Sequence, residues 1–153
     1  MYFYNLIKEM ASKNDLILFI DMDGVIASYD IGKNPFDFLH KRPLTQNIAN
    51  IKEVSELENV EVCILSVCRE DSQIEDKNVW LDANAPFFKK ENRNIISRAS
   101  QDWKSAKDIK TDFLKDVKTD KQIVLVDDDN EVLKHIHQNY GNIIVLQDSE
   151  LVD

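Results

Sequence analysis

The sequence has little glycine, proline and cysteine, and each shortage excludes certain kinds of protein or segment. Only three glycines and three prolines occur in 153 residues, so we find no linker and no low-complexity tract, and each of these residues marks a break in the chain. The two cysteines, Cys63 and Cys68, are too few for a disulfide framework and favour a reducing compartment. We therefore expect one cytoplasmic domain that spans residues 1–153.

Basic residues and long apolar runs are also scarce. The chain carries 19 Lys and Arg against 28 Asp and Glu, a net charge of −9, whereas a protein that coats nucleic acid usually presents a basic face. No apolar run is long enough to span a bilayer, so we expect no membrane association. Residues 1–13 include an acidic residue and no long apolar core, so they are not expected to be a signal peptide.

What the chain does have is an alternation of short apolar runs with helical patterns. We predict strands at 16–20, 60–65, 94–97, 122–126 and 142–146, and helices at 3–10, 45–57, 72–84, 105–117 and 130–140. Thr45 is expected to cap the second helix, and Ser72 with Glu75 forms a capping-box pattern at the third. Strands that are apolar on both faces and alternate with helices predict a three-layer α/β/α, Rossmann-like parallel sheet. Residues 25–44 remain as a minimal cap or substrate loop.

Polar side chains follow three of the predicted strands. Asp21 and Asp23 follow the first strand, Ser66 ends the second, and Asp127 and Asp128 follow the fourth. Ligands of parallel α/β sheets bind beyond the carboxyl ends of the strands, so we expect these residues to share one site.

The aspartates in this set are typical of a magnesium site. Gly24 allows a sharp turn directly after Asp21 and Asp23, which brings their carboxylates together. Adjacent carboxylates such as Asp127 and Asp128 repel one another unless a cation neutralises them, and Mg²⁺ prefers a few carboxylates plus water. The next residue, Asp129, fits the start of the following helix, where the helix dipole favours an acid.

One lysine has helical spacing that places it among apolar residues. Lys110 falls on the stripe that holds Ile109, Phe113 and Leu114, whereas Lys104 and Lys107 fall elsewhere. A lysine that faces the core needs a partner for its ammonium, and a phosphate beside aspartates is one. Together with a Ser66 hydroxyl, this set predicts phosphoryl transfer, although the pattern leaves Lys104 and Lys107 open as the phosphate lysine.

These residues resemble the four motifs of the haloacid-dehalogenase (HAD) phosphohydrolase superfamily. The motifs appear in order as Phe19-Ile20-Asp21-Met22-Asp23-Gly24-Val25, Ile64-Leu65-Ser66, Lys110, and Val124-Leu125-Val126-Asp127-Asp128. The resemblance implies that Asp21 attacks phosphorus and becomes phospho-aspartate, and that Asp23 transfers protons. It also implies that Asp21, the Asp23 carbonyl and Asp127 hold Mg²⁺ with support from Asp128. Ser66 and Lys110 would then bind phosphoryl oxygens.

Two branches of that superfamily suggest different substrates. Val25, where many members have threonine, and the segment Lys77-Asn78-Val79-Trp80-Leu81 are similar to the deoxyribonucleotidase branch, which implies a nucleotide or a similar small phosphate ester. The segment 102–110 resembles the phosphatase domain of phage-type polynucleotide kinase, which implies a polynucleotide 3′ end. An open groove lined by Lys33, Lys41, Arg42 and Arg69 would favour the polynucleotide, and a closed pocket would favour the small ester.

Other functions fit the sequence less well. A signalling receiver domain also uses phospho-aspartate, but there the acidic pair ends the first strand and the nucleophile ends the third. A catalytically silent phosphate- or metal-binding module remains a lower alternative. We expect Trp80 and Trp103 to be packing residues rather than stacking platforms, and Phe36 and Phe38 to close the core.

Overall fold

A computed structural model describes residues 2–152, and its centre is one parallel sheet. The strands are β1 (Leu16–Ile20), β2 (Val60–Cys68), β3 (Arg93–Ser97), β4 (Gln122–Asp127) and β5 (Ile144–Gln147). Their order in the sheet is β3-β2-β1-β4-β5, with every neighbouring pair parallel. Because β1 lies at the centre, between β2 and β4, the residues that follow it face those that follow both neighbours.

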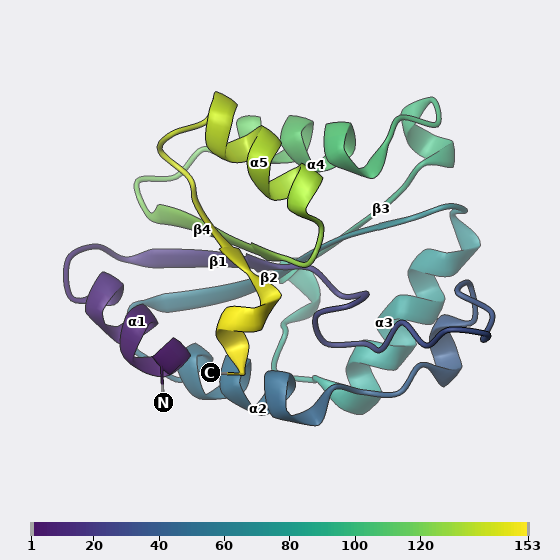
Figure 1. The fold of residues 1–153 in the computed structure, drawn as a ribbon, viewed down its shortest axis with the longest axis horizontal. Coiled ribbons are helices and arrows are strands. Elements are labelled where there is room, and N and C mark those ends of the chain that lie inside the picture. Colours follow the sequence, from purple (N-terminus) through teal and green to yellow (C-terminus); the bar gives the residue numbers. More distant parts are fainter. Residues whose placement is uncertain (1, 153) are drawn as a thin grey trace.

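Helices cover both faces of the sheet. In Figure 1, α1 (Tyr2–Ala11), α2 (Thr45–Ser55) and α3 (Ser72–Asn84) lie below the sheet, and α4 (Ala106–Lys115) and α5 (Asn130–Asn139) lie above it. Short 3₁₀ turns, η1 (Phe38–His40), η2 (Lys90–Asn92), η3 (Ala99–Gln101) and η4 (Asp148–Leu151), complete the described elements. The predicted three-layer α/β/α fold is therefore confirmed.

A hydrophobic core lies between the sheet and each of the two helix layers. Successive side chains of a strand point alternately into one core and the other. In β1, Leu18 and Ile20 pack in the core of the α1–α3 layer, whereas Phe19 points into the core of the α4–α5 layer. This period of two is what a strand buried on both faces requires. Cys63 lies in the second core, and both cysteines are buried free thiols.

One predicted strand end and two predicted helix caps were wrong. The strand β2 extends to Cys68, because its residues from Ile64 onward pair with β3, so Ser66 lies within the strand and does not end it. Leu44 precedes α2, so Thr45 is its first residue and no side chain caps it. At α3 the expected capping box does not form, because Asp71 precedes the helix and Ser72 is already its first residue. The Gln73 side chain accepts hydrogen bonds from the backbone N–H groups of Arg69 and Glu70.

The chain between β1 and α2 is a loop whose first and last segments are joined by backbone hydrogen bonds. Leu44 N donates to Ile26 O over 2.8 Å, and Ser28 N donates to Arg42 O over 2.8 Å. The loop contains only the short turn η1, which packs against α3. Within residues 2–152, no helix is both long and apolar enough to cross a bilayer.

Candidate functional site

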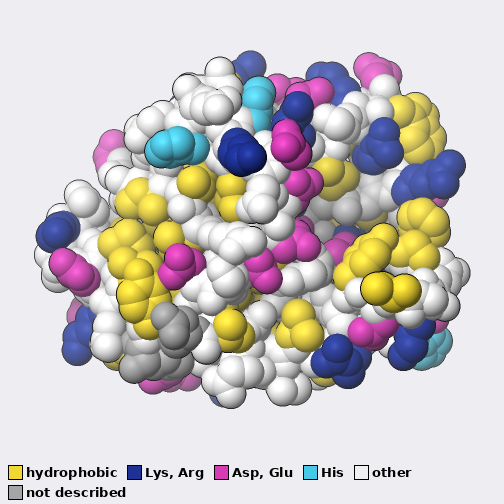
Figure 2. All heavy atoms as spheres, in the orientation of Figure 1, with side chains coloured by type: hydrophobic (Ala, Val, Ile, Leu, Met, Phe, Trp, Pro, Cys, Tyr) yellow, Lys and Arg dark blue, Asp and Glu magenta, His cyan; other side chains and the backbone are white. Residues whose placement is uncertain are grey.

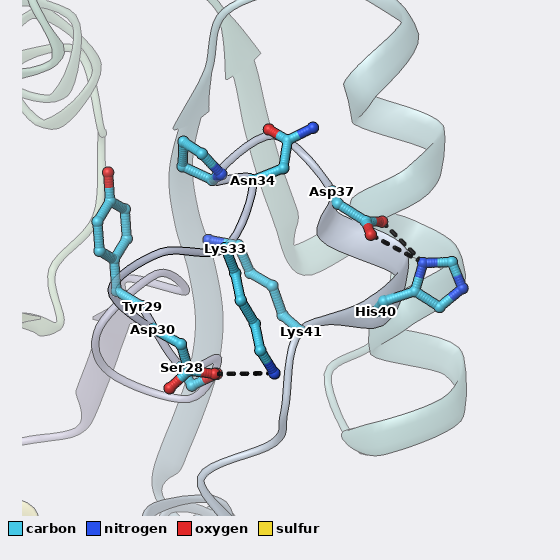
Figure 3. Close-up of a pocket in the computed structure, with 9 residues that line it drawn as sticks. Ser28, Tyr29, Asp30, Lys33, Asn34, Asp37, His40 and Lys41 are labelled. Carbon is cyan, nitrogen blue, oxygen red and sulfur yellow. Dashed lines mark hydrogen bonds and ion pairs between the residues drawn. The ribbon is translucent and has the colours of Figure 1, made fainter.

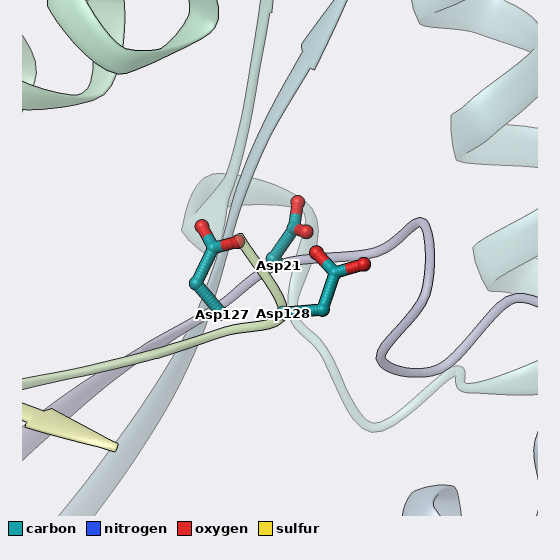
Figure 4. Close-up of side chains that lie close together, drawn as sticks. All are labelled: Asp21, Asp127 and Asp128. Carbon is teal, nitrogen blue, oxygen red and sulfur yellow. The ribbon is translucent and has the colours of Figure 1, made fainter. Parts of the chain in front are cut away.

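Three carboxylates converge where β1 and β4 end side by side (Figure 4). Asp21 is the first residue after β1, Asp127 is the last residue of β4, and Asp128 follows it. One oxygen from each carboxylate lies within 4.8 Å of the others. Asp21 N donates to Val126 O over 3.0 Å, and Asp127 Oδ1 accepts from Asp129 N over 3.0 Å, so backbone contacts fix the positions of both acids.

A buried lysine from α4 joins two of these carboxylates. Lys110 Nζ lies 3.0 Å from Asp21 Oδ1 and 2.6 Å from Asp127 Oδ2. The predicted core-facing position of Lys110 is confirmed, because only 4% of the residue is exposed. By contrast, Lys104 lies before the helix and is exposed, where it pairs with Asp112 over 3.3 Å. The helical stripe thus located the lysine that reaches the acids.

The cluster contains more acidic groups than basic ones. Burial raises the pKa of Asp21 well above its ordinary value; Lys110 opposes this, and the carboxylates of Asp127, Asp23 and Asp128 add to it. Burial also raises the pKa of Asp128, to about 6. Burial would lower the pKa of Lys110, but Asp21 and Asp127 outweigh it and hold that pKa above its usual range. One lysine therefore does not neutralise three neighbouring acids.

Gly24 makes room for this cluster. Its φ of +84° lies in the left-handed region, and a Cβ at this position would overlap the carboxylate of Asp128. The carbonyl of Met22 accepts hydrogen bonds from the N–H groups of the three residues 25–27, which closes the turn. The glycine of the first motif is therefore required both by the backbone conformation and by the approach of Asp128.

The second acid of the first motif, Asp23, is held by two lysines. Asp23 Oδ1 accepts from Lys41 Nζ and Asp23 Oδ2 accepts from Lys77 Nζ, each over 2.8 Å. Burial alone would raise the pKa of Asp23, but Lys77 and Lys41 outweigh it and hold the pKa below its ordinary value. Asp23 is therefore an ionised carboxylate between two ammonium groups.

Lys77 is a site residue to which the sequence analysis gave no role. It is fully buried on α3, and its ammonium also donates to Ser66 Oγ over 2.7 Å. The signal was present, because Lys77 precedes the buried Trp80 and Leu81 by three and four residues and so shares their helix face. Ser66 itself is fully buried and reaches the acids through Lys77.

Two adjoining cavities open onto these residues. One, of about 560 Å³, is lined by Asp21, Lys110, Asp127 and Asp128. The other, of about 500 Å³, is lined by aromatic and basic side chains, among them Phe36, Arg69 and Trp103. Asp23, Tyr29, Val67 and Ala106 line both. The acidic cluster and the aromatic cavity are therefore neighbours, with Asp23 at their boundary.

The basic residues expected around a substrate do not share one groove. Lys41 and Arg69 line the aromatic cavity, but Lys33 and Arg42 pair with Asp30, with N···O distances of 3.9 and 3.4 Å. Lys33 instead lines a cavity of about 260 Å³ within the loop itself (Figure 3). The open groove of four cations that would have favoured a polynucleotide is therefore not formed, because Asp30 holds Lys33 and Arg42 elsewhere.

The aromatic residues divide between core and surface. Trp80 and Phe38 are buried, as predicted, and Trp80 Nε1 donates to Lys41 O over 2.9 Å. Trp103 and Phe36 are 48% and 47% exposed, so their predicted packing roles were wrong. Figure 2 shows acidic side chains near the middle of one face, and hydrophobic side chains beside basic ones toward its right edge.

Comparisons of the chain with protein-family models and with curated proteins found no match.

Proposed function

We propose that the protein is a magnesium-dependent phosphomonoesterase, a HAD-type hydrolase, that acts on a nucleotide or a similar small phosphate ester through a phospho-aspartate at Asp21. The contact of Lys110 with both Asp21 and Asp127 carries the proposal. A buried carboxylate beside an ammonium and a second acid resembles the arrangement that phosphoryl transfer requires, in which positioning and charge neutralisation provide most of the catalysis.

The donor set fits a divalent cation. When ionised, Asp21, Asp127 and Asp128 carry three negative charges and Lys110 carries one positive charge, which leaves two negative charges. Their oxygens lie within 4.8 Å of one another, and a few carboxylates plus water is the set that Mg²⁺ prefers. Bound there by Asp21, Asp127, Asp128 and the carbonyl of Asp23, Mg²⁺ would withdraw charge from the phosphoryl group. The raised pKa values of Asp21 and Asp128 are consistent with a site built for a cation.

The contacts of the site residues support the roles that we propose for them. Asp21 is the nucleophile, since it is buried and Lys110 lies 3.0 Å from its oxygen. Asp23 transfers protons; Lys41 and Lys77 favour its ionised form, which suits the step in which a water must be deprotonated to hydrolyse phospho-aspartate. To protonate a leaving group first, Asp23 must take up a proton, which becomes easier when the negative charge of an incoming phosphate offsets the two ammonium groups.

Two ammonium groups, those of Lys110 and Lys41, border the cavities proposed for the substrate, and a third, that of Lys77, is buried against Asp23. Lys110 is the predicted phosphate lysine, and Lys41 and Lys77 are added by their contacts with Asp23. Ser66, which the sequence analysis expected to donate directly to phosphate, is held by Lys77 over 2.7 Å. We propose that Ser66 orients Lys77 as well as offering its hydroxyl.

A second candidate is removal of a terminal phosphate from a polynucleotide. It is favoured by the half-exposed rings of Phe36 and Trp103 along the cavity that adjoins Asp23, since an open wall admits a large leaving group. The net charge of −9 favours the smaller substrate.

Phosphate release in the presence of Mg²⁺ tests the proposed function. The panel contains nucleoside monophosphates, sugar phosphates and a 3′-phosphorylated oligonucleotide, with Asp21→Asn and added EDTA as controls. We expect release from at least one class, and loss of that release with either control. Binding of Mg²⁺ without release from any of them would contradict the proposal and favour a silent binding module.

A further inference from the structure

The strongest unassigned feature is the aromatic cavity that adjoins Asp23. It has a volume of about 500 Å³, and Phe36, Arg69 and Trp103 form part of its wall. The guanidinium carbon of Arg69 lies 6.0 Å from the ring centre of Phe36 and 6.0 Å from that of Trp103. Because this distance is the outer limit of a cation–π contact, the three side chains are neighbours without being tightly stacked.

The backbone presents Trp103 to this cavity at a conformational cost. Asp102 and Trp103 have φ values of +53° and +58°, and they are the two non-glycine residues with positive φ within residues 2–152. The guanidinium of Arg98 holds this conformation by donating to Trp103 O over 2.9 Å and to Lys104 O over 2.8 Å. Strain that the surrounding structure maintains, and that leaves a large ring half exposed, is typical of functional positions.

The position of the aromatic cavity indicates which part of the substrate it would bind. Asp23, Tyr29, Val67 and Ala106 line both it and the cavity of the acidic cluster. A phosphoryl group beside Asp21 and Lys110 would therefore direct its ester oxygen toward Asp23 and the rest of its alcohol toward Phe36 and Trp103. Exposed rings beside a cation favour a planar aromatic group, because such a group stacks on both.

We propose that this cavity binds the leaving group of the substrate through a planar aromatic ring, as in a nucleoside, with Trp103 and Phe36 as stacking residues and Arg69 between them. The proposal rests on the proposed phosphatase activity and names its substrate class. Two sources share this chemistry, a free nucleoside monophosphate and the phosphorylated end of a polynucleotide. The experiment below distinguishes them.

The kinetic test compares substrates with and without a ring. For Trp103→Ala, we expect kcat/KM for a nucleoside monophosphate to fall about 5- to 100-fold, the range found when a base loses a stacking ring. For glycerol phosphate, which has no ring, kcat/KM should stay within about twofold. The control is Tyr2→Ala, since Tyr2 is also 48% exposed but lies on α1. An equal fall on both substrates, or no fall for the nucleotide, overturns the proposal.

A binding measurement decides the proposal even if no substrate is hydrolysed. The sequence has two tryptophans, and Trp80 is buried while Trp103 is exposed. Nucleoside monophosphate should therefore quench the fluorescence of wild type, and the quenching should be lost in Trp103→Phe, which retains Trp80. Inorganic phosphate and glycerol phosphate should quench neither. Equal quenching of wild type and Trp103→Phe, or quenching by inorganic phosphate, overturns the proposal.

Two further results are informative. One distinguishes a free nucleotide from a polynucleotide end as the source of the ring, and the other distinguishes failure of the ring subsite from failure of the phosphatase activity. Tighter binding of a 3′-phosphorylated oligonucleotide than of the mononucleotide would assign the ring to a strand end, and the reverse would assign it to a free nucleotide; the ring subsite holds in either case. Failure of the phosphatase activity would appear as no phosphate release from glycerol phosphate or nucleotide in wild type. Failure of the ring subsite would appear as a release that Trp103→Ala does not change selectively.

Discussion

The ammonium of Lys77 lies 2.8 Å from a carboxylate oxygen of Asp23, across a separation of 54 residues in the sequence. This contact ties α3 to the turn after β1. The ammonium of Lys77 also donates to Ser66 Oγ over 2.7 Å and to Val67 O over 3.3 Å. Since Lys77 is fully buried, these three acceptors satisfy its charge without water.

Replacing Lys77 should therefore destabilise the fold. In Lys77→Met we expect a loss of about 2 kcal/mol in the free energy of unfolding, less than for most broken buried pairs because Lys41 still contacts Asp23. Urea denaturation measures the change. The matched control is Lys13→Met, which removes an exposed pair with Glu9 and should cost less than about 0.5 kcal/mol. Equal losses in the two variants would contradict the importance assigned to Lys77.

The three lysines near α4 should differ in their effects on activity. Lys110→Ala should lower kcat/KM about 100-fold or more, because it removes the ammonium that faces Asp21 and Asp127. Lys104→Ala and Lys107→Ala should retain most activity. Steady-state kinetics on a substrate that wild type hydrolyses checks all three. An active Lys110→Ala would disprove the role that its helix face and contacts suggest.

Two glycines with the same backbone strain test the turn after β1. Gly24 and Gly32 have φ values of +84° and +85°, but only at Gly24 would a Cβ meet other atoms, those of Asp128. Either substitution to alanine should cost about 1 kcal/mol for the left-handed conformation. Gly24→Ala should in addition weaken Mg²⁺ binding, which isothermal titration calorimetry would detect. Equal Mg²⁺ affinity in the two variants would show that Asp128 does not need the space.

The acidic cluster should make stability depend on pH when no metal is bound. The pKa of Asp128 is about 6 in the folded protein against an ordinary value of 3.8, so between these values the folded state holds a proton that the unfolded state has lost. Stability from this group therefore falls as pH rises through that range. Asp21 acts in the same direction.

Asp128→Asn should remove this contribution. With EDTA present, we expect the melting temperature of the variant to exceed that of wild type at pH 7 but not at pH 4. Because the Asp128 carboxylate is only partly buried and solvent reaches it, screening keeps the gain near 2–4 °C, or about 1 kcal/mol. Asp120→Asn, at another exposed acid, is the control. A gain that is equal at both pH values would contradict the account, and added Mg²⁺ should stabilise wild type more than Asp128→Asn.

Much of the fold was predictable, because strands buried on both faces give unbroken apolar runs. The carboxyl ends of β1 and β4 were found from Asp21 and Asp127, and a parallel sheet then requires those ends to meet. The end of β2 was not found, since pairing with β3 extends the strand past the apolar run to Cys68. A neighbouring strand, which the local sequence does not reveal, determined that boundary.

The site was predictable where a regular element carried it. Lys110 was located because a helix has a period that assigns each residue to a face, and the same test would have found Lys77. Lys41 and Trp103 lie in irregular segments. Such segments have no regular repeat from which the direction of a side chain could be predicted. The burial of Lys41 against Asp23 and the positive φ of Trp103 depend on long-range contacts, so only the folded chain reveals them.

The most direct test is to find the phosphoryl group on the protein itself. The protein is mixed with Mg²⁺ and a substrate that it hydrolyses, quenched in acid, and its peptides are analysed by mass spectrometry. We predict a phosphoryl group on Asp21 that is absent in Asp21→Asn. With an aryl phosphate, whose leaving group needs no protonation, it should accumulate in Asp23→Asn, because Asp23 then cannot activate the water that removes it. Phosphate release that persists in Asp21→Asn, or a phosphoryl group on another residue, would contradict the account.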